Sequence, residues 1–386
     1  MLHSPWSRRK SLCPWPATAS LSCRPTYILA QRSSRRSPRK PLRPRSRSLM
    51  NHLGYNGALF GDRDLESPRV DDESAWFSWR EHWSLRRGVT YLNHGSFGPP
   101  PNPVRAARQR WIDKLDSEPM DFFVGQLEEE LAHVTTRLAG FVGASPDDLV
   151  MVENATHAMN VVAGSVRLTA GDEVVLTDHE YGAVRRIWER ACRRAGARLV
   201  VAQIPFPPQS EDEVLQAICA PLGPRTRLVV FSHITSPTAM ILPAEAICRA
   251  VRERGALVCV DRPHAPAQVP LSLARLDCDF YTASCHKWLS ASFGSGFLYV
   301  HPRHQAAIEP LNLSWGRLEP NKPQSWNEEF IWTGTRDPSA MLSVPEAIDF
   351  LESAGLEAFR ARSHHLATSG ARLVEEVTGL PPVLDA

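Results

Sequence analysis

Two residues that could do chemistry follow apolar runs of the kind that form buried strands. Asp261 ends the run ALVCVD, and Lys287 follows CDFYTAS, 26 residues later. A carboxylate at the end of a buried strand is costly unless a cation meets it, and a lysine amine can form a Schiff base. Taken singly, Asp261 is more simply explained by a salt bridge to Arg262 or another neighbour, and Lys287 by a solvated loop.

A group of small and polar residues could hold an anion near the lysine. The segment ENATHAMN (153–160) begins a predicted helix, and the backbone N–H groups at Ala155 to His157 would be free to bind an anion there. The Thr156 hydroxyl suits the same ligand. Ser284 and His286 stand beside the lysine and could contact it too.

Tyr181, in the segment TDHEYGA, follows a further strand end, and its ring could stack on a flat ligand. Pyridoxal phosphate (PLP) requires a lysine amine, a carboxylate for its pyridine nitrogen, phosphate ligands and a stacking group. Each signal is weak alone, and Tyr181 by itself would more often be a packing residue. Because all of them follow strand ends, together they predict a PLP site with Lys287 and Asp261 at its centre.

The segments that must position these residues alternate between strand and helix patterns. Short apolar runs predict strands at 148–152, 172–178, 197–204, 226–233, 256–261, 278–284 and 296–300. Helical periodicity predicts helices at 104–116, 124–142, 154–166, 182–195, 211–221, 243–255, 339–353 and 356–378. Continuous apolar strands separated by helices indicate an α/β fold with a mainly parallel sheet covered on both faces. Ligands bind at the carboxyl ends of such strands.

The charge is unevenly distributed along the 386 residues. The chain has 44 Lys and Arg against 42 Asp and Glu, but 12 of the basic residues and none of the acidic ones lie within residues 1–50. The rest of the chain is therefore acidic, which gives no electrostatic reason to expect a nucleic-acid partner. The Arg-, Ser- and Pro-rich residues 1–50 are predicted to be disordered. They could be a transit peptide, a basic nucleic-acid-binding tail, or upstream sequence if translation starts at Met50.

The cysteines and the hydropathy pattern bear on the compartment. The eight cysteines are scattered without a CxxC pair or metal-ligand spacing, and no metal site is predicted. No apolar run approaches the roughly 18 residues of a membrane span. We therefore expect a cytoplasmic protein without a membrane partner, or an organelle-matrix protein if residues 1–50 are a transit peptide.

At the level of whole motifs, the sequence resembles a known enzyme family. The segments YLNHGSFGPPP, ENATHAMN, TDHEYGA, SHITSPTAMILP, VDRPHAPAQ and DFYTASCHKWL are similar to those of class V aminotransferase-fold enzymes. Within that class they look closest to the isopenicillin N epimerase-like branch, which includes cysteine desulfhydrases and hercynylcysteine sulfoxide lyases. The resemblance runs from about residue 75 to the end. It implies a fold-type-I PLP enzyme that forms a homodimer.

The resemblance also implies residue roles. Lys287 would form the Schiff base and Asp261 would pair with the pyridine nitrogen. The remaining implied residues are His264 and Ser236 near the phenolic oxygen, Thr156, Ser284 and His286 at the phosphate, Thr335 reaching the phosphate of the neighbouring subunit, and Asn93 and His94 at the substrate pocket.

The chain departs from the family pattern in three places. Arg262 and Pro263 stand where small residues are usual, and His157 replaces a second hydroxyl. The sequence ends at Ala386, before a stretch that in relatives completes a small domain and supplies a carboxylate-binding arginine. We therefore expect residues 51–335 to form a large PLP-binding domain with an N-terminal arm, and 336–386 the start of a truncated small domain. Arg336 is the candidate replacement for the missing arginine.

The expected reaction begins with removal of the Cα proton of an amino-acid-type substrate by Lys287. Epimerisation, loss of a sulfur leaving group and transamination all share this first step, so the sequence leaves them open. A desulfurase needs an acceptor cysteine on a mobile loop, and residues 305–335 contain none. The remaining alternative is a truncated homologue that binds PLP without catalysis.

Overall fold

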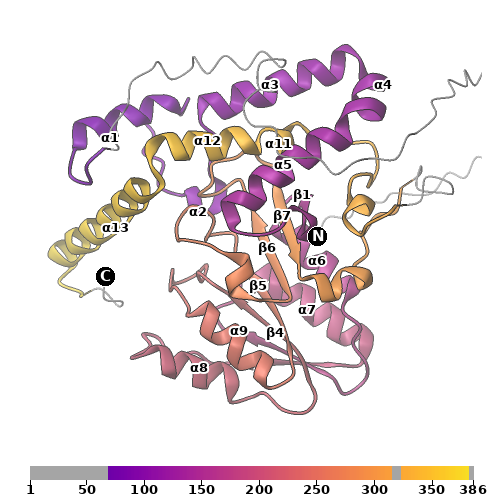
Figure 1. Ribbon diagram of the computed structural model, residues 1–386. Helices are drawn as coiled ribbons and strands as arrows, with labels where there is room; N and C mark the ends of the chain where they lie inside the picture. Colours follow the sequence, from indigo (N-terminus) through magenta and orange to yellow (C-terminus); the bar gives the residue numbers. More distant parts are fainter. Residues whose placement is uncertain (1–67, 315–322, 382–386) are drawn as a thin grey trace, which may run out of the picture. The chain divides into compact units, whose positions relative to one another are not determined.

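The computed structural model describes residues 68–314 and 323–381. These residues all fall within one compact unit, Leu65–Ala386. Figure 1 shows this unit as a central sheet with helices packed around it. The predicted basic tail, residues 1–50, lies outside the described residues, and the predicted division at residue 335 stays a prediction.

A seven-stranded sheet forms the centre of the unit, in the order β1-β7-β6-β5-β4-β2-β3. The strands are β1 (Leu149–Val152), β2 (Glu173–Thr177), β3 (Arg198–Ala202), β4 (Thr226–Ser232), β5 (Leu257–Asp261), β6 (Phe280–Ser284) and β7 (Gly296–Val300). The neighbouring pairs among β2 to β6 are parallel, and β7 is antiparallel to both β1 and β6. Each strand lies within a segment predicted from the sequence, and the mainly parallel sheet is confirmed.

The strands are mostly apolar, as expected for a sheet that helices cover on both faces. All residues of β1, β2, β6 and β7 are buried. The hydrophobic core on one side joins strand residues such as Val174 and Leu298 to helix residues such as Met159 and Trp188. Burial on both faces explains the lack of a polar alternation in these segments.

The crossover connections determine which helices cover which face. The chain runs from β1 through α6 (Ala155–Ser165) to β2, and through α7 (Gly182–Ala195) to β3 at the sheet edge. It then returns in the opposite direction through α8 (Glu211–Cys219) to β4 and α9 (Ala244–Glu253) to β5. Right-handed crossovers made in opposite directions place their helices on opposite faces. In agreement, α6 packs on α7 and α8 packs on α9 (Figure 1).

The other helices pack beside this α/β core. They are α1 (Glu73–Trp79), α2 (His94–Phe97), α3 (Asn102–Ser117), α4 (Pro119–Asp121), α5 (Leu127–Val142), α10 (Leu273–Leu276), α11 (Ser339–Leu342), α12 (Val344–Ala354) and α13 (Leu356–Thr378). Single helical turns also occur at Arg80–His82, Phe122–Gln126, Pro146–Asp148, Pro302–Ala307 and Asn327–Phe330. The segment 339–353, expected as one helix, divides into α11 and α12 because Pro345 is tolerated only in a first helical turn. Within the described ranges, no helix is both long and apolar enough to cross a membrane.

Candidate active site

The carboxyl ends of β1, β2, β4, β5 and β6 lie at one edge of the sheet, and a pocket of about 570 Å³ opens there. Ten of the predicted site residues line it. They are Asn93, Ala155, Thr156, Tyr181, Ser236, Asp261, His264, Ser284, His286 and Lys287. The volume lies within the range typical of cofactor and small-molecule sites. The structure thus brings together residues separated by almost 200 positions in the sequence.

Lys287 is positioned by a turn after β6 that packs tightly against the segment 93–98. The Gly98 amide donates a hydrogen bond to the His286 carbonyl (3.1 Å). A Cβ atom at Gly98 would overlap the Lys287 carbonyl oxygen, so a side chain cannot be accommodated without moving the lysine backbone. Gly98 is therefore required for the close approach of these two segments.

We expect Gly98→Ala to lower the free energy of unfolding by about 2 kcal/mol, since overpacking against backbone cannot be relieved by a rotamer change. Cofactor binding should weaken as well, because the Lys287 backbone must shift. Chemical denaturation and a PLP titration measure the two effects. The matched control is Gly140→Ala in α5, where an added Cβ meets nothing within 4 Å. Equal stability of the two variants would contradict the proposed packing role.

Asp261 ends β5 and is only 2% exposed. Its Oδ1 atom accepts a hydrogen bond from the Thr282 hydroxyl (2.7 Å), while Oδ2 has no donor among the described residues. Burial raises the pKa of Asp261 to about 6, and the Thr282 hydroxyl and the positive charge of Lys287 oppose this shift. Ionisation of this carboxyl group therefore costs desolvation free energy. Its Oδ2 atom is available to a ligand in the pocket.

This cost predicts that removing the charge stabilises the ligand-free protein. The pKa of Asp261 rises from 3.8 unfolded to about 6 folded, so ionisation is penalised in the folded state. The penalty is absent below about pH 4 and complete above about pH 6. Asp261→Asn should therefore raise the free energy of unfolding by roughly 2 kcal/mol at pH 7, and by much less at pH 4. Denaturation of the two cofactor-free proteins at both pH values is the measurement, and a less stable Asn variant at pH 7 would refute it.

His264 connects Lys287 to a neighbouring tryptophan. Its Nε2 atom lies 3.4 Å from the Lys287 amine, and its Nδ1 atom accepts a hydrogen bond from the Trp288 indole N–H (3.4 Å). Since an indole N–H only donates, a neutral His264 carries its proton on Nε2, facing the lysine. Burial, and secondarily the charge of Lys287, lowers the pKa of His264 to about 4. Burial also lowers the pKa of Lys287, which favours the unprotonated amine.

The anion-binding part of the pocket lies at the start of α6. The Ala155 amide donates to the Ser284 hydroxyl oxygen (3.0 Å), which joins the helix to the end of β6. In the first turn of α6 the Thr156 N–H has no acceptor within the helix. His286 Nδ1 lies 3.2 Å from the Ser295 carbonyl, to which it can only donate, so Nε2 donates to an anion only when the imidazole is protonated. The helix N-terminus and these side chains together suit a phosphate.

The remaining predicted residues are divided between this pocket and other places. Tyr181 is 51% exposed and lines the pocket. Its side chain has no hydrogen-bond partner among the described residues. His94 packs its ring against Tyr91 and Trp288 and is not a lining residue. His157 lies behind the pocket wall, where its ring is 3.8 Å from the carboxylate of Glu153. Their roles stay predictions.

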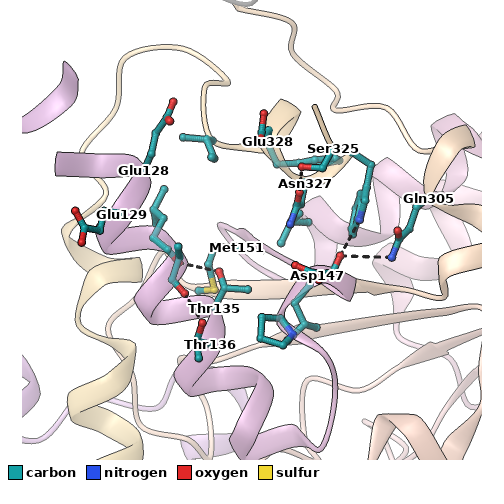
Figure 2. A pocket seen from close by; sticks show the side chains of 18 of the residues that line it. Glu128, Glu129, Thr135, Thr136, Asp147, Met151, Gln305, Ser325, Asn327 and Glu328 are labelled. Atoms are coloured by element: carbon teal, nitrogen blue, oxygen red, sulfur yellow. Dashed lines mark hydrogen bonds between the residues drawn. The ribbon is translucent and has the colours of Figure 1, made fainter. Parts of the chain in front are cut away.

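Thr335 and Arg336 also lie outside the lining of this pocket. Thr335 is exposed, and its contact with a neighbouring subunit stays a prediction. Arg336 instead lines a second pocket of about 730 Å³, between α5 and residues 325–331. Figure 2 shows this pocket, whose labelled side chains include acidic Glu128, Glu129 and Glu328. Among the described residues its lining contains no lysine or cysteine, and Arg336 is the predicted site residue that it includes.

Several polar residues around the first pocket were missed by sequence analysis. Thr282 and Ser232 are strand residues, and Trp288 directly follows the lysine. Glu180 lies beside Tyr181 and accepts hydrogen bonds from Thr177 and Ser232. A polar residue inside an otherwise apolar strand was the available signal for Thr282 and Ser232. No comparable signal separated Glu180 from an ordinary loop carboxylate.

Comparison with known proteins agrees with this geometry. The family model for aminotransferase class-V matches residues 117–381. The chain belongs to this family. It is a PLP-dependent enzyme with a fold-type-I architecture, so the family, fold class, enzyme class and cofactor predicted from the sequence are confirmed.

Individual relatives include two isopenicillin N epimerases. The one from Amycolatopsis lactamdurans is 40% identical over 326 residues, which cover 81% of this chain and 82% of the relative. The one from Streptomyces clavuligerus is 38% identical and covers 79% of each chain. A putative L-cysteine desulfhydrase of Oryza sativa subsp. japonica is 31% identical over 77% of this chain and 65% of its own length.

Solved structures share the fold at lower sequence identity. A mutant of C-DES with glycine covalently linked to the PLP cofactor has a TM-score of 0.66 and 22% identity, and covers 73% of this chain and 76% of its own. The apo cysteine desulfurase from Thermococcus onnurineus has a TM-score of 0.64 and 19% identity, with 81% and 77% covered.

The residues in the first pocket fit the cofactor. The carboxyl group of Asp261, whose Oδ2 atom has no hydrogen-bond donor among the described residues, a lysine amine with a lowered pKa and a helix N-terminus joined to Ser284 line one cavity. These are the groups that would meet the ring nitrogen, the aldehyde carbon and the phosphate, respectively. No charged residue other than Asp261, Lys287 and the two histidines lines this pocket within the described ranges.

Proposed function

We propose that this protein acts at Cα of an amino acid or amino-acid-derived substrate, with epimerisation as its first candidate reaction and C–S bond cleavage as its second. The observation that carries the proposal is the convergence of Lys287, His264 and Asp261 in one pocket, with the lysine amine 3.4 Å from the histidine. The two epimerases at 40% and 38% identity favour the first reaction. The desulfhydrase relative favours the second.

Bound PLP supplies an electron sink that acidifies the Cα–H bond of a substrate joined to it. Asp261 would support this chemistry by holding the ring nitrogen protonated through its free Oδ2 atom. Thr282 fixes the carboxylate orientation through its hydrogen bond to Oδ1. The anchor for the cofactor would be Lys287, the lysine among the lining residues.

Lys287 would also move the substrate proton. Its amine is half-buried, and burial lowers its pKa, so a larger fraction is unprotonated and able to accept a proton at neutral pH. His264 Nε2–H faces the amine and would orient it. The Trp288 indole maintains this tautomer of His264. At the other end, Thr156 and Ser284 would fix the phosphate and hence the ring. Burial lowers the pKa of His286, so its Nε2 atom would donate to the phosphate only where the bound anion favours the protonated imidazole.

The fate of the deprotonated carbon distinguishes the candidate reactions. Return of the proton to the opposite face gives epimerisation, and expulsion of a sulfur group at the neighbouring carbon gives a lyase. A desulfurase reaction is disfavoured because no cysteine of the described residues lines the pocket, and Cys285 beside the lysine is fully buried with its pKa raised to about 12. Such a thiol is a poor nucleophile.

The finer assignments belong to the same proposal. We place the protein in the cytoplasm as a homodimer in which the exposed Thr335 contacts the cofactor phosphate of the other subunit. Asn93 lines the pocket and is assigned to substrate binding. Arg336 keeps its assignment as a carboxylate ligand only if substrate reaches the second pocket, where the structure places it.

A single substrate panel tests the proposed reaction. The PLP-loaded protein is incubated with isopenicillin N, L-cysteine, cysteine conjugates and common amino acids, and each mixture is scored for inversion at Cα, sulfide release and keto-acid release. We expect inversion without keto-acid accumulation. Sulfide release with an equal amount of keto acid and ammonia would select the lyase reaction, and keto-acid release without sulfide would contradict both in favour of transamination.

A further inference from the structure

Glu180 joins the ends of two strands at the base of the first pocket. Its Oε1 atom accepts hydrogen bonds from the Thr177 hydroxyl (2.6 Å) and the Ser232 amide (2.9 Å), and its Oε2 atom accepts one from the Ser232 hydroxyl (2.7 Å). Glu180 is not itself a lining residue, but Ser232 and the adjacent Tyr181 are. A carboxyl group that receives three donors is held in one orientation and is stabilised in its ionised form.

The carboxyl group of Glu180 also acts on Asp261. Ser232, at the end of β4, is the register partner of Asp261, at the end of β5. Burial raises the pKa of Glu180 to about 7, the three donors oppose this shift, and the negative charge of Asp261 adds to it. Within the described ranges no ion pair neutralises Glu180. Two interacting carboxyl groups therefore lie at the base of the pocket. Among the described residues that line it, the Lys287 amine is the positive charge that opposes them.

We propose that Glu180 is a positioning residue that acts with Asp261 as a second negative charge, so that the two carboxylates together hold the proton on the cofactor ring nitrogen. This inference rests on the proposed pairing of Asp261 with that nitrogen. Glu180 exerts its effect through the field at Asp261 and through Ser232, without touching the cofactor.

The direction of the effect follows from the charges that face Glu180. Asp261 on β5 is negative, Lys287 and His264 lie across the pocket, and Asp178 and His179 belong to the same loop as Glu180. Protonation of the ring nitrogen places a positive charge beside Asp261, which favours ionisation of both carboxyl groups. Each ionised carboxylate in turn raises the proton affinity of the ring nitrogen. Two unit charges within roughly 12 Å of each other, at an effective dielectric constant near 20, interact strongly enough to move a protonation midpoint by roughly one pH unit or more.

The test is a titration of the ring nitrogen in the PLP-loaded protein. The protein is loaded with PLP labelled with ¹⁵N in the ring, and the nitrogen chemical shift is followed against pH in wild type and Glu180→Gln. The Gln side chain keeps the two hydrogen bonds at Oε1, and its amide can donate to the Ser232 hydroxyl, so geometry is retained while the charge is lost. We expect the midpoint in Glu180→Gln to fall by about one pH unit, with the thermal midpoint of the protein little changed.

Matched variants separate the possible outcomes. Asp178→Asn removes a carboxylate from the same loop, where it accepts a hydrogen bond from the Ile204 amide, and should leave the midpoint unchanged. Ser232→Ala removes one hydrogen-bond donor to Glu180 and so favours the protonated form of Glu180. It should lower the midpoint of the ring nitrogen by a smaller amount than Glu180→Gln. This variant tests the proposal if Glu180→Gln does not fold. If Glu180→Gln and Ser232→Ala both keep the wild-type midpoint while Asp261→Asn shifts it, the role of Glu180 is only to join the two strands. No shift in Asp261→Asn would instead overturn the proposed role of Asp261.

Discussion

Lys287→Ala should reduce turnover by roughly 10²- to 10⁴-fold, the usual contribution of a positioned general acid–base. The variant should still bind PLP through the phosphate contacts at the start of α6, because Ala155, Thr156 and Ser284 remain in place. It should lack the visible absorbance band of the lysine-bound cofactor. Steady-state kinetics and absorbance spectroscopy measure the two losses.

Chemical rescue and a matched lysine complete this experiment. Small primary amines can enter a pocket of about 570 Å³ and should restore part of the activity of Lys287→Ala, since the missing group is an amine. Lys114→Ala is the control, because Lys114 pairs with Glu130 and does not line the pocket. Activity of Lys287→Ala within about tenfold of wild type would contradict the assignment of Lys287 as proton-transfer base.

Asp261→Asn should lower turnover by roughly 10²- to 10³-fold, comparable with removal of one strong electrostatic contact to a developing charge. The Asn side chain is nearly isosteric and its carbonyl oxygen can still accept the Thr282 hydroxyl, so the fold is preserved. Without the carboxylate, bound PLP would lack the group that holds its ring nitrogen protonated and would be a weaker electron sink. The absorbance band of lysine-bound cofactor should remain, because Lys287 is untouched.

Asp261→Asn is also expected to stabilise the cofactor-free protein at pH 7, so activity and stability should change in opposite directions. This opposition separates a functional carboxylate from a structural one, whose loss lowers both. Asp178→Asn serves as a comparison, since it alters a strand-end carboxylate that does not line the pocket. Near-normal turnover of Asp261→Asn across pH 6 to 9 would contradict the role given to Asp261.

The sheet could be predicted from the sequence because its strands are continuous apolar runs that helical segments separate. The predicted residues that line the pocket include Ala155, Ser284 and Lys287, which lie at the end of such a run or within three residues after it. Parallel pairing brings all carboxyl ends to one edge, so their proximity could be inferred without coordinates. The antiparallel placement of β7 between β1 and β6 carried no such signal, since a buried strand reads the same in either direction.

The direction of loop side chains could not be predicted from spacing. His94 turns toward Tyr91 and Trp288 although its neighbour Asn93 lines the pocket, and that choice depends on aromatic packing between distant segments. Arg336 lines another pocket together with residues 325–331, and spacing alone did not indicate this either. Glu180 was missed because its importance arises from Ser232, 52 residues later in the chain.

The most direct measurement of the central claim is to identify the lysine that carries the cofactor. The chain has five lysines, at positions 10, 40, 114, 287 and 322. The PLP-loaded protein is reduced with borohydride, digested and mapped by mass spectrometry, with Lys287→Ala treated in parallel. We predict a single pyridoxyl modification on Lys287 and none in the variant. A stoichiometric modification on any of the other four lysines, or an unmodified Lys287 in protein that has bound PLP, would contradict the account.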